Sequence, residues 1–466
     1  MSFDPILAEK RFGYGLSPRV AAPVSVADML ARLQGPDEVA ARFPIEPFPV
    51  FRARMLEAIT LRKDMRQVRG TDAAKALKKD IQLVKKAARE EHRRWLALSL
   101  IRRAWTGDGF RERLAAFWAD HFTAQGKAGL LKRGTSPYIE AAIRPHLSGR
   151  FADLLYAVTT SPLMLHYLDQ ENSMGPGSPK AEKRGAKAGL NENLARELLE
   201  LHTLGVGAAY SQEDVRQLAE LLTGLTFDAN QGTKFRKDFA EPGAETVLGK
   251  RYGGGQPGLG DIRAVLEDLA AHPATAGHIA RKLAVHFTSD TPDPDLVRVL
   301  TERYRDTGGD LAQVYEALLS HPAAWVPELS NIKLPDEFVA SAMRALAVDP
   351  QLFTGIEDGR EHEKLVQRLF LQPLRLMGQP WQDPLGPDGW AEDDAAWMTP
   401  QGLTARMEWA LSAPARMCDP LPDPRVFVTD ALGRDAPEPV RFAAKASENK
   451  REGIALILAS PAFQRK

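Results

Sequence analysis

The sequence predicts an all-α protein: a large multi-helix body with one small β-hairpin insertion at about residues 226–252. Two observations predict this class. Apolar residues recur at steps of three and four through most of the chain, which is the period of a helix with one buried face. Only the insertion alternates as a half-buried strand does. We expect a single domain over residues 1–466, or two lobes, 1–225 and 259–466, that meet near the insertion.

The first third of the chain contains clear helix signals. Asp4 and Pro5 supply an N-cap and a first-turn proline. A long helix is expected over 71–106, because an apolar seam there follows alternating steps of four and three residues. The seam consists of Leu77, Ile81, Val84, Ala88, Trp95 and Leu98. The next helix is expected over 110–122.

Lysine and arginine cluster between Lys75 and Arg94. A contact with nucleic acid and a solvated helix face are the two interpretations. Aromatic residues do not interleave with these basic residues, as they do where bases stack on a protein. The sequence therefore favours a solvated face and no nucleic-acid partner.

Within the insertion, residues 233–239 and 245–248 alternate like two strands, with Glu241, Pro242 and Gly243 as the turn between them. We expect these two segments to pair as the hairpin.

Composition excludes several classes of protein. The 466 residues include 61 basic and 61 acidic side chains, so there is no overall attraction to nucleic acid or to an anionic membrane. The single cysteine, Cys418, excludes an internal disulfide and a cysteine-based zinc site. The first residues lack the basic and apolar regions of an export signal, and no stretch is long enough to span a bilayer. We expect a soluble, cytoplasmic protein without membrane insertion.

The most distinctive segment is Gly189–Gly205, which places four charged residues, two asparagines and a histidine in one short helix. Asn191 is a good N-cap and Gly205 a usual terminator, so the helix is expected from Asn191 to Leu204. At about 100° per residue, one arc holds Glu192, Arg196 and Glu200, flanked by Asn193 and Glu197. His202 falls with the leucines on the opposite side.

Two interpretations of this arc remain. Spacing of four residues allows Arg196 to be shared by Glu192 and Glu200 in a structural ladder, which we favour over a catalytic group. A metal site is not expected, because Glu200 and His202 are two residues apart and point to different sides. The sequence names no cofactor.

Other candidate residues lie outside this helix. His121 falls in the apolar stripe of the 110–122 helix, where a hydrogen-bonded core histidine is usual, and Asp120 projects away from that stripe. A loop between Gln379 and Pro400 carries three tryptophans. Trp381 and Trp390 would form a platform for a sugar or peptide if exposed, or would fix the loop to the core if buried.

Searches for familiar catalytic motifs fail: the chain has no nucleophile elbow, zincin motif, Walker loop or EF-hand. Gly253, Gly255 and Gly258 match the spacing of a dinucleotide fingerprint. Pro257 interrupts it and no alternation of strands and helices surrounds it, so we reject that site.

Several motifs together resemble a bacterial family, domain of unknown function 1800 (DUF1800). They are Phe117–Phe122, Leu165–Asp169, Gly189–Gly205 and Tyr210–Val215, followed by similar blocks at Thr246–Gly249, His272–Phe287 and Gly378–Trp390. The resemblance implies a mainly helical protein and carries over no catalytic residue. It also implies a working partner of a sulfatase-like family, DUF1501, because members of the two families are often encoded side by side.

Two hypotheses about function follow. The first is an accessory or binding protein that works with a DUF1501-type partner, with Asn191, Asn193, Trp381 and Trp390 as binding residues. The second is a hydrolase with its site on the Asn191–Leu204 helix. Its catalytic residues would be Glu192, Arg196, Glu197, Glu200, His202 and His121, with a glutamate as general base, an arginine holding an anionic group and a histidine transferring a proton.

Overall fold

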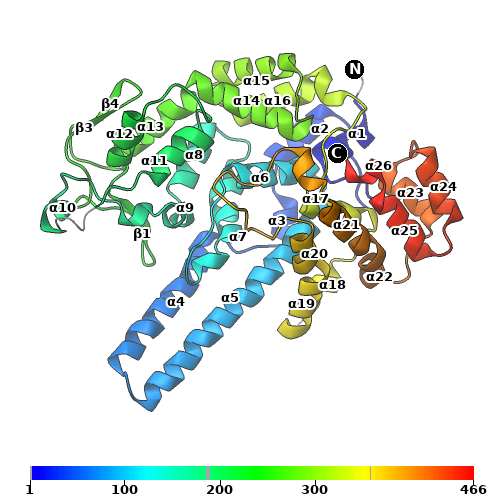
Figure 1. Cartoon of the computed structure of the whole chain (residues 1–466), viewed down its shortest axis with the longest axis horizontal. Coiled ribbons are helices and arrows are strands. Elements are labelled where there is room, and N and C mark those ends of the chain that lie inside the picture. Colours follow the sequence, from blue (N-terminus) through cyan, green and yellow to red (C-terminus); the bar gives the residue numbers. More distant parts are fainter. Residues whose placement is uncertain (1–2, 185–188, 357) are drawn as a thin grey trace.

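Helices dominate the computed structural model, which describes residues 3–184, 189–356 and 358–466 (Figure 1). The strands are confined to two small antiparallel hairpins, so the prediction of a mostly α protein with a small β insertion is confirmed.

The helices before the β insertion are α1 (Pro5–Leu7), α2 (Val26–Gln34), α3 (Glu38–Arg42), α4 (Phe48–Gln67), α5 (Asp72–Trp105), α6 (Gly109–His121), α7 (Thr135–Tyr138), α8 (Phe151–Thr159), α9 (Pro162–Tyr167), α10 (Pro179–Arg184), α11 (Asn193–Glu197) and α12 (Gln212–Leu221). Those after it are α13 (Leu259–Ala271), α14 (Pro273–Phe287), α15 (Pro294–Asp306), α16 (Leu311–Ser320), α17 (Pro335–Ala345), α18 (Gln351–Thr354), α19 (Gly359–Val366), α20 (Gln372–Leu376), α21 (Pro400–Ser412), α22 (Pro414–Met417), α23 (Pro424–Leu432), α24 (Glu438–Ala446), α25 (Lys450–Ala459) and α26 (Pro461–Gln464).

Several helices begin with the same pair of residues, a side-chain N-cap followed by a proline. A side chain that accepts a hydrogen bond precedes a proline in the first turn, as at Asp4, Asp293, Thr399 and Ser460. The cap satisfies a free backbone N–H, and proline has no N–H to leave unpaired and a φ already suited to the helix. This local chemistry makes the boundaries readable from the sequence.

The β insertion differs from the prediction. Strand β1 (Leu225–Asp228) pairs with β2 (Gly232–Phe235), and β3 (Ala244–Val247) pairs with β4 (Lys250–Gly253). The expected pairing of 233–239 with 245–248 is therefore wrong: each segment belongs to its own hairpin. The β3–β4 hairpin closes through a two-residue turn, Leu248 and Gly249, which both have positive φ (50° and 76°), as tight hairpin turns require.

Helices α4 and α5 form an antiparallel pair that extends away from the rest of the molecule, at the lower left of Figure 1. We call residues 62–89, at its far end, the basic arm. They include ten basic and three acidic residues, most of them exposed. The predicted long helix is confirmed, with Thr71 as its N-cap.

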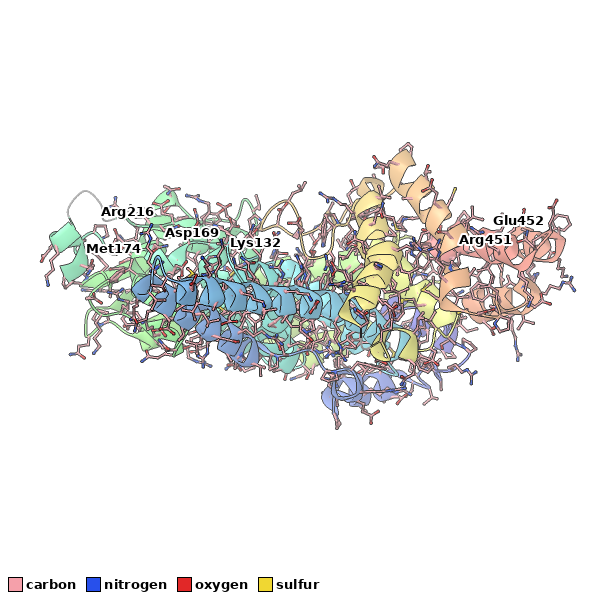
Figure 2. All side chains as sticks on the ribbon, turned by 90° about the horizontal axis from the view of Figure 1, so that it is seen from below. Lys132, Asp169, Met174, Arg216, Arg451 and Glu452 are labelled. Atoms are coloured by element: carbon pink, nitrogen blue, oxygen red, sulfur yellow. The ribbon has the colours of Figure 1, made fainter. Side chains whose placement is uncertain are left out.

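Helix α6 lies in the middle of the molecule (Figure 1). Its residues Phe110, Leu114, Phe117 and Trp118 are buried in a hydrophobic cluster that also takes in parts of α14, α16 and α17. Seen from below, the molecule is elongated, with Asp169 and Met174 towards one end and Arg451 and Glu452 at the other (Figure 2).

Candidate functional site

A cavity of about 200 Å³ opens beside α6, between α14, α17 and the loop 379–399, which we call the tryptophan loop. We name it the Asp120 cavity after the carboxyl group in its wall. Its polar and aromatic lining includes Asp120, Glu392, Asp394, His286, Asn331, Trp381, Trp390 and Trp397.

Asp120 lies near the carboxyl end of α6, and the tryptophan loop closes over it. The backbone N–H of Trp390 donates to Asp120 Oδ1 over 2.8 Å. Gly389, with φ of 80°, passes so close that a Cβ there would lie 2.6 Å from Asp120 Oδ1. Burial raises the pKa of Asp120 to about 7; nearby Glu392 and Asp336 also raise it, and Lys282 lowers it.

The sequence alone places Asp120 away from the apolar stripe of α6 but gives it no role. The position of Asp120 on the helix nevertheless indicates that a second segment could cover it. An acid on the polar side of an otherwise buried helix must meet either solvent or another segment, and the tryptophan loop supplies that segment.

The basic side chains that line the cavity are all engaged in ion pairs. Their partners are Glu140 for Arg102, Asp336 for Arg103, Asp37 and Glu112 for Arg144, and Glu337 for Lys466. Lys282, next to Asp120, pairs with Glu392 over 2.8 Å. In the described chain no ion pair involves Asp120 or Asp394, so these two carboxyls are the acids of the lining without a basic partner.

The two tryptophans named as binding candidates both line this cavity. Trp381 is partly exposed, and its ring centroid lies 4.6 Å from that of His92. Trp390 is also partly exposed and meets buried Trp397 edge to face, at 6.0 Å between centroids. Part of each ring thus fixes the loop while part remains available to the cavity.

The Asn191 helix begins two residues later than expected, because α11 starts at Asn193. Its N-cap is therefore Glu192, and the expectation that Asn191 is the N-cap is wrong. Asn191 lies one residue earlier, where its Oδ1 accepts from the N–H of Asn193 over 2.8 Å. The last turn, Leu198–His202, is π-helical, and Gly205 follows with φ of 93°. The side chain of Asn191 also donates to the backbone oxygen of Asp169.

The ladder of charges on this helix is present. Arg196 contacts Glu192 over 3.1 Å and Glu200 over 3.5 Å. About a third of each of these side chains is exposed, and Gln212 bonds to both Glu192 and Arg196.

Removing the shared charge is expected to cost little, because exposed ion pairs contribute about 0–1 kcal/mol. Arg196→Gln should therefore lower the free energy of unfolding by less than about 1 kcal/mol in a urea titration. A loss several times larger would contradict the description of the ladder as solvent-screened.

Glu197 stands apart from the ladder. In the described chain no ion pair involves it, and it is half-buried. Burial raises its pKa, as do the neighbouring Glu200 and Asp388, while Arg196 lowers it. Asp388 belongs to the tryptophan loop, so Glu197 faces the same loop as Asp120 does.

His121 and His202 are brought together, with ring centroids 6.3 Å apart, and His278 lies 6.0 Å from His121. His121 and His202 are buried; His121 Nε2 donates to the backbone oxygen of His202 over 3.2 Å. Neither lines the Asp120 cavity. The cavity is not lined by Glu192, Arg196, Glu197 or Glu200 either.

Burial lowers the pKa of His202 to about 3, and Lys282 and His278 lower it further. Below its ordinary pKa of 6.5 the unfolded chain takes up a proton at this residue and the folded chain does not. The contribution of neutral His202 to the free energy of unfolding is thus fully present above pH 6.5 and decreases as the pH falls below that value. At pH 5 the decrease reaches about 2 kcal/mol. Between pH 7 and pH 5, urea titrations should show the free energy of unfolding falling by about 2 kcal/mol less in His202→Leu than in wild type. An equal fall in the two proteins would contradict this account of His202.

Metal and membrane features give two further findings. Within residues 3–184, 189–356 and 358–466, no group of three or more His, Cys, Asp or Glu side chains is placed to hold a metal ion. In the same described residues, no helix is both long and apolar enough to cross a membrane.

Fold and cavity together define a mostly α-helical protein with a cavity of about 200 Å³ lined by acidic and aromatic side chains. A family model described as "Protein of unknown function (DUF1800)" matches residues 8–465, and the chain belongs to this family. The resemblance drawn from the motifs is thereby confirmed. Searches of curated proteins and of solved structures give no match.

Proposed function

We propose that this protein is a binding protein that holds a small, hydroxyl-bearing ring molecule of the saccharide class in the Asp120 cavity. One observation carries the proposal: a largely enclosed carboxyl without an ion-pair partner lies in the wall of a cavity that two partly exposed tryptophans also line. The Trp390 N–H occupies one acceptor position of the Asp120 carboxyl, and a ligand hydroxyl could donate to the other oxygen. Tryptophan faces suit the apolar side of a sugar ring.

The size of the cavity favours a ligand of about one ring. Pockets for drug-sized ligands measure about 300–1,000 Å³, whereas this one measures about 200 Å³. We therefore propose a monosaccharide or the end of a longer chain as the occupant.

Titration calorimetry with a panel of methyl monosaccharides tests the proposal. Wild type should bind at least one of them, and Ala116→Trp, which places a large side chain in the cavity wall, should bind at least tenfold more weakly, a difference of about 1.4 kcal/mol. Leu385→Trp is the matched control, because Leu385 is fully exposed on the same loop and lies outside the lining. Equal binding by wild type and Ala116→Trp would overturn the proposed site.

We further propose an accessory role beside a sulfatase-like DUF1501 partner, which the family resemblance motivates. Affinity purification at native expression level tests this role. Recovery of a stoichiometric DUF1501-type protein would support it, and recovery of this chain alone would contradict it.

A hydrolase is the second candidate function. It is favoured by Glu197, an unpaired carboxyl with a raised pKa, as a general base requires. Glu197→Gln removes the charge at nearly constant shape. Ester and glycoside turnover that survives this change unaltered would exclude Glu197 as the base, whereas loss of turnover with unchanged thermal stability would support it.

A further inference from the structure

The polar atoms left free in the Asp120 cavity call for a ligand that donates hydrogen bonds. Asn331 is 6% exposed and donates through Nδ2 to the backbone oxygens of Val285 and His286. Its Oδ1, which can only accept, has no partner among the described residues, and neither does His286 Nε2. Both residues line the cavity, and buried polar atoms normally have partners.

The charges of the cavity add a second requirement. Every basic side chain in the lining is already held by a carboxylate, and Lys282 is held by Glu392. Asp394 accepts from the N–H of Ile332 over 2.7 Å; burial and nearby Asp290 raise its pKa, while Lys466 and Arg465 lower it without forming an ion pair with it in the described chain. An anionic ligand would meet two carboxyls without a basic partner and, among the described residues, no free cation, which disfavours it.

We infer that the ligand carries a positive charge, an inference that rests on the proposed function. The ligand is an amino sugar or an equivalent ring-shaped ammonium compound, and its ammonium group lies against Asp120 and Asp394. Such a ligand supplies N–H and O–H donors to Asn331 Oδ1 and to the two carboxyls. The tryptophans add to its binding, since a cation over an indole face is attracted to it.

Three probes of one shape separate the charge of the ligand from its ring: the methyl glycosides of glucose, glucosamine and glucuronic acid. Calorimetry at neutral pH should rank them glucosamine first, glucose second and glucuronic acid last. We expect the amine to bind about tenfold more tightly than the neutral sugar, which corresponds to about 1.4 kcal/mol.

Asp120→Asn provides the matched variant, because its side-chain oxygen can still accept from Trp390. It should abolish the preference for the amine, so that the methyl glycosides of glucosamine and glucose bind the variant with affinities within about twofold of each other. Asp394→Asn should reduce the same preference. Thermal midpoints near that of wild type establish that both variants are folded.

The outcomes distinguish the inference from the proposed function. Binding with no preference for the amine, or with the uronic acid preferred, overturns the inference and leaves the sugar site in place. No binding of any probe to wild type overturns both. A preference that survives Asp120→Asn and Asp394→Asn assigns the charge recognition elsewhere and also overturns the inference.

Discussion

Glu337→Gln should lower the free energy of unfolding by about 3–5 kcal/mol, the cost of removing one partner from a buried ion pair. Glu337 is 2% exposed and accepts from Arg113 over 2.6 Å and from Lys466 Nζ over 2.7 Å. Arg113 is also buried, at 1% exposed. The substitution leaves two buried cations without their counter-charge, which is the source of the loss.

The measurement is urea unfolding of wild type and variant at neutral pH, with Arg298→Met as the control. Arg298 forms its pairs at the exposed surface, so its loss should leave the midpoint nearly unchanged. Arg113 and Lys466 hold the pKa of Glu337 well below its ordinary value of 4.5 against the effect of burial. Its contribution is therefore complete above pH 4.5 and is lost as the pH falls below that value. A Gln variant as stable as wild type would refute the ion-pair account.

Gly389→Ala is expected to detach the tryptophan loop from α6. Alanine at a φ of 80° is strained by about 1–2 kcal/mol, and its Cβ would lie 2.6 Å from Asp120 Oδ1 and 2.8 Å from the Asp120 backbone oxygen. Overpacking of this kind adds about 1–3 kcal/mol. We expect a lower thermal midpoint and, in proteolysis, faster cleavage within residues 379–399.

Gly378→Ala isolates the steric clash, because Gly378 has a φ of 95° but no described atom within 4 Å of the point that a Cβ would occupy. Both variants carry the backbone strain, and only Gly389→Ala meets Asp120. Equal losses in the two variants would show that the contact with Asp120 contributes nothing to the placement of the loop.

Local chemistry explains which parts of the fold could be predicted. The α5 helix follows from its seam and the cap at Thr71, and the proline-started helices follow from signals within four residues. Strand pairing is different, because alternation identifies a strand but not its partner. The β3–β4 turn uses Leu248 at positive φ, which a leucine rarely adopts, so only Gly249 gives a turn signal there.

In the candidate site, too, features set by neighbouring residues are predictable from the sequence and features set by tertiary packing are not. The Arg196 ladder is predictable because its members are four residues apart on one helix. The Asp120 cavity is not, since Trp390 and Asp120 are 270 positions apart in the chain and only tertiary packing brings them together. The tryptophans stand out as candidates in the sequence, but the cavity that they share with Asp120 does not.

The basic arm changes the meaning of the balanced composition. Residues 62–89 carry seven more basic than acidic side chains, and because the whole chain has 61 of each, the remainder carries seven more acidic ones. The molecule is thus neutral in sum and a strong electric dipole in space, with its positive pole at the end of α4 and α5. Such a particle turns as it approaches a charged surface, presenting its arm to anions and its body to cations. It should be retained on a cation exchanger near the pH at which its net charge is zero.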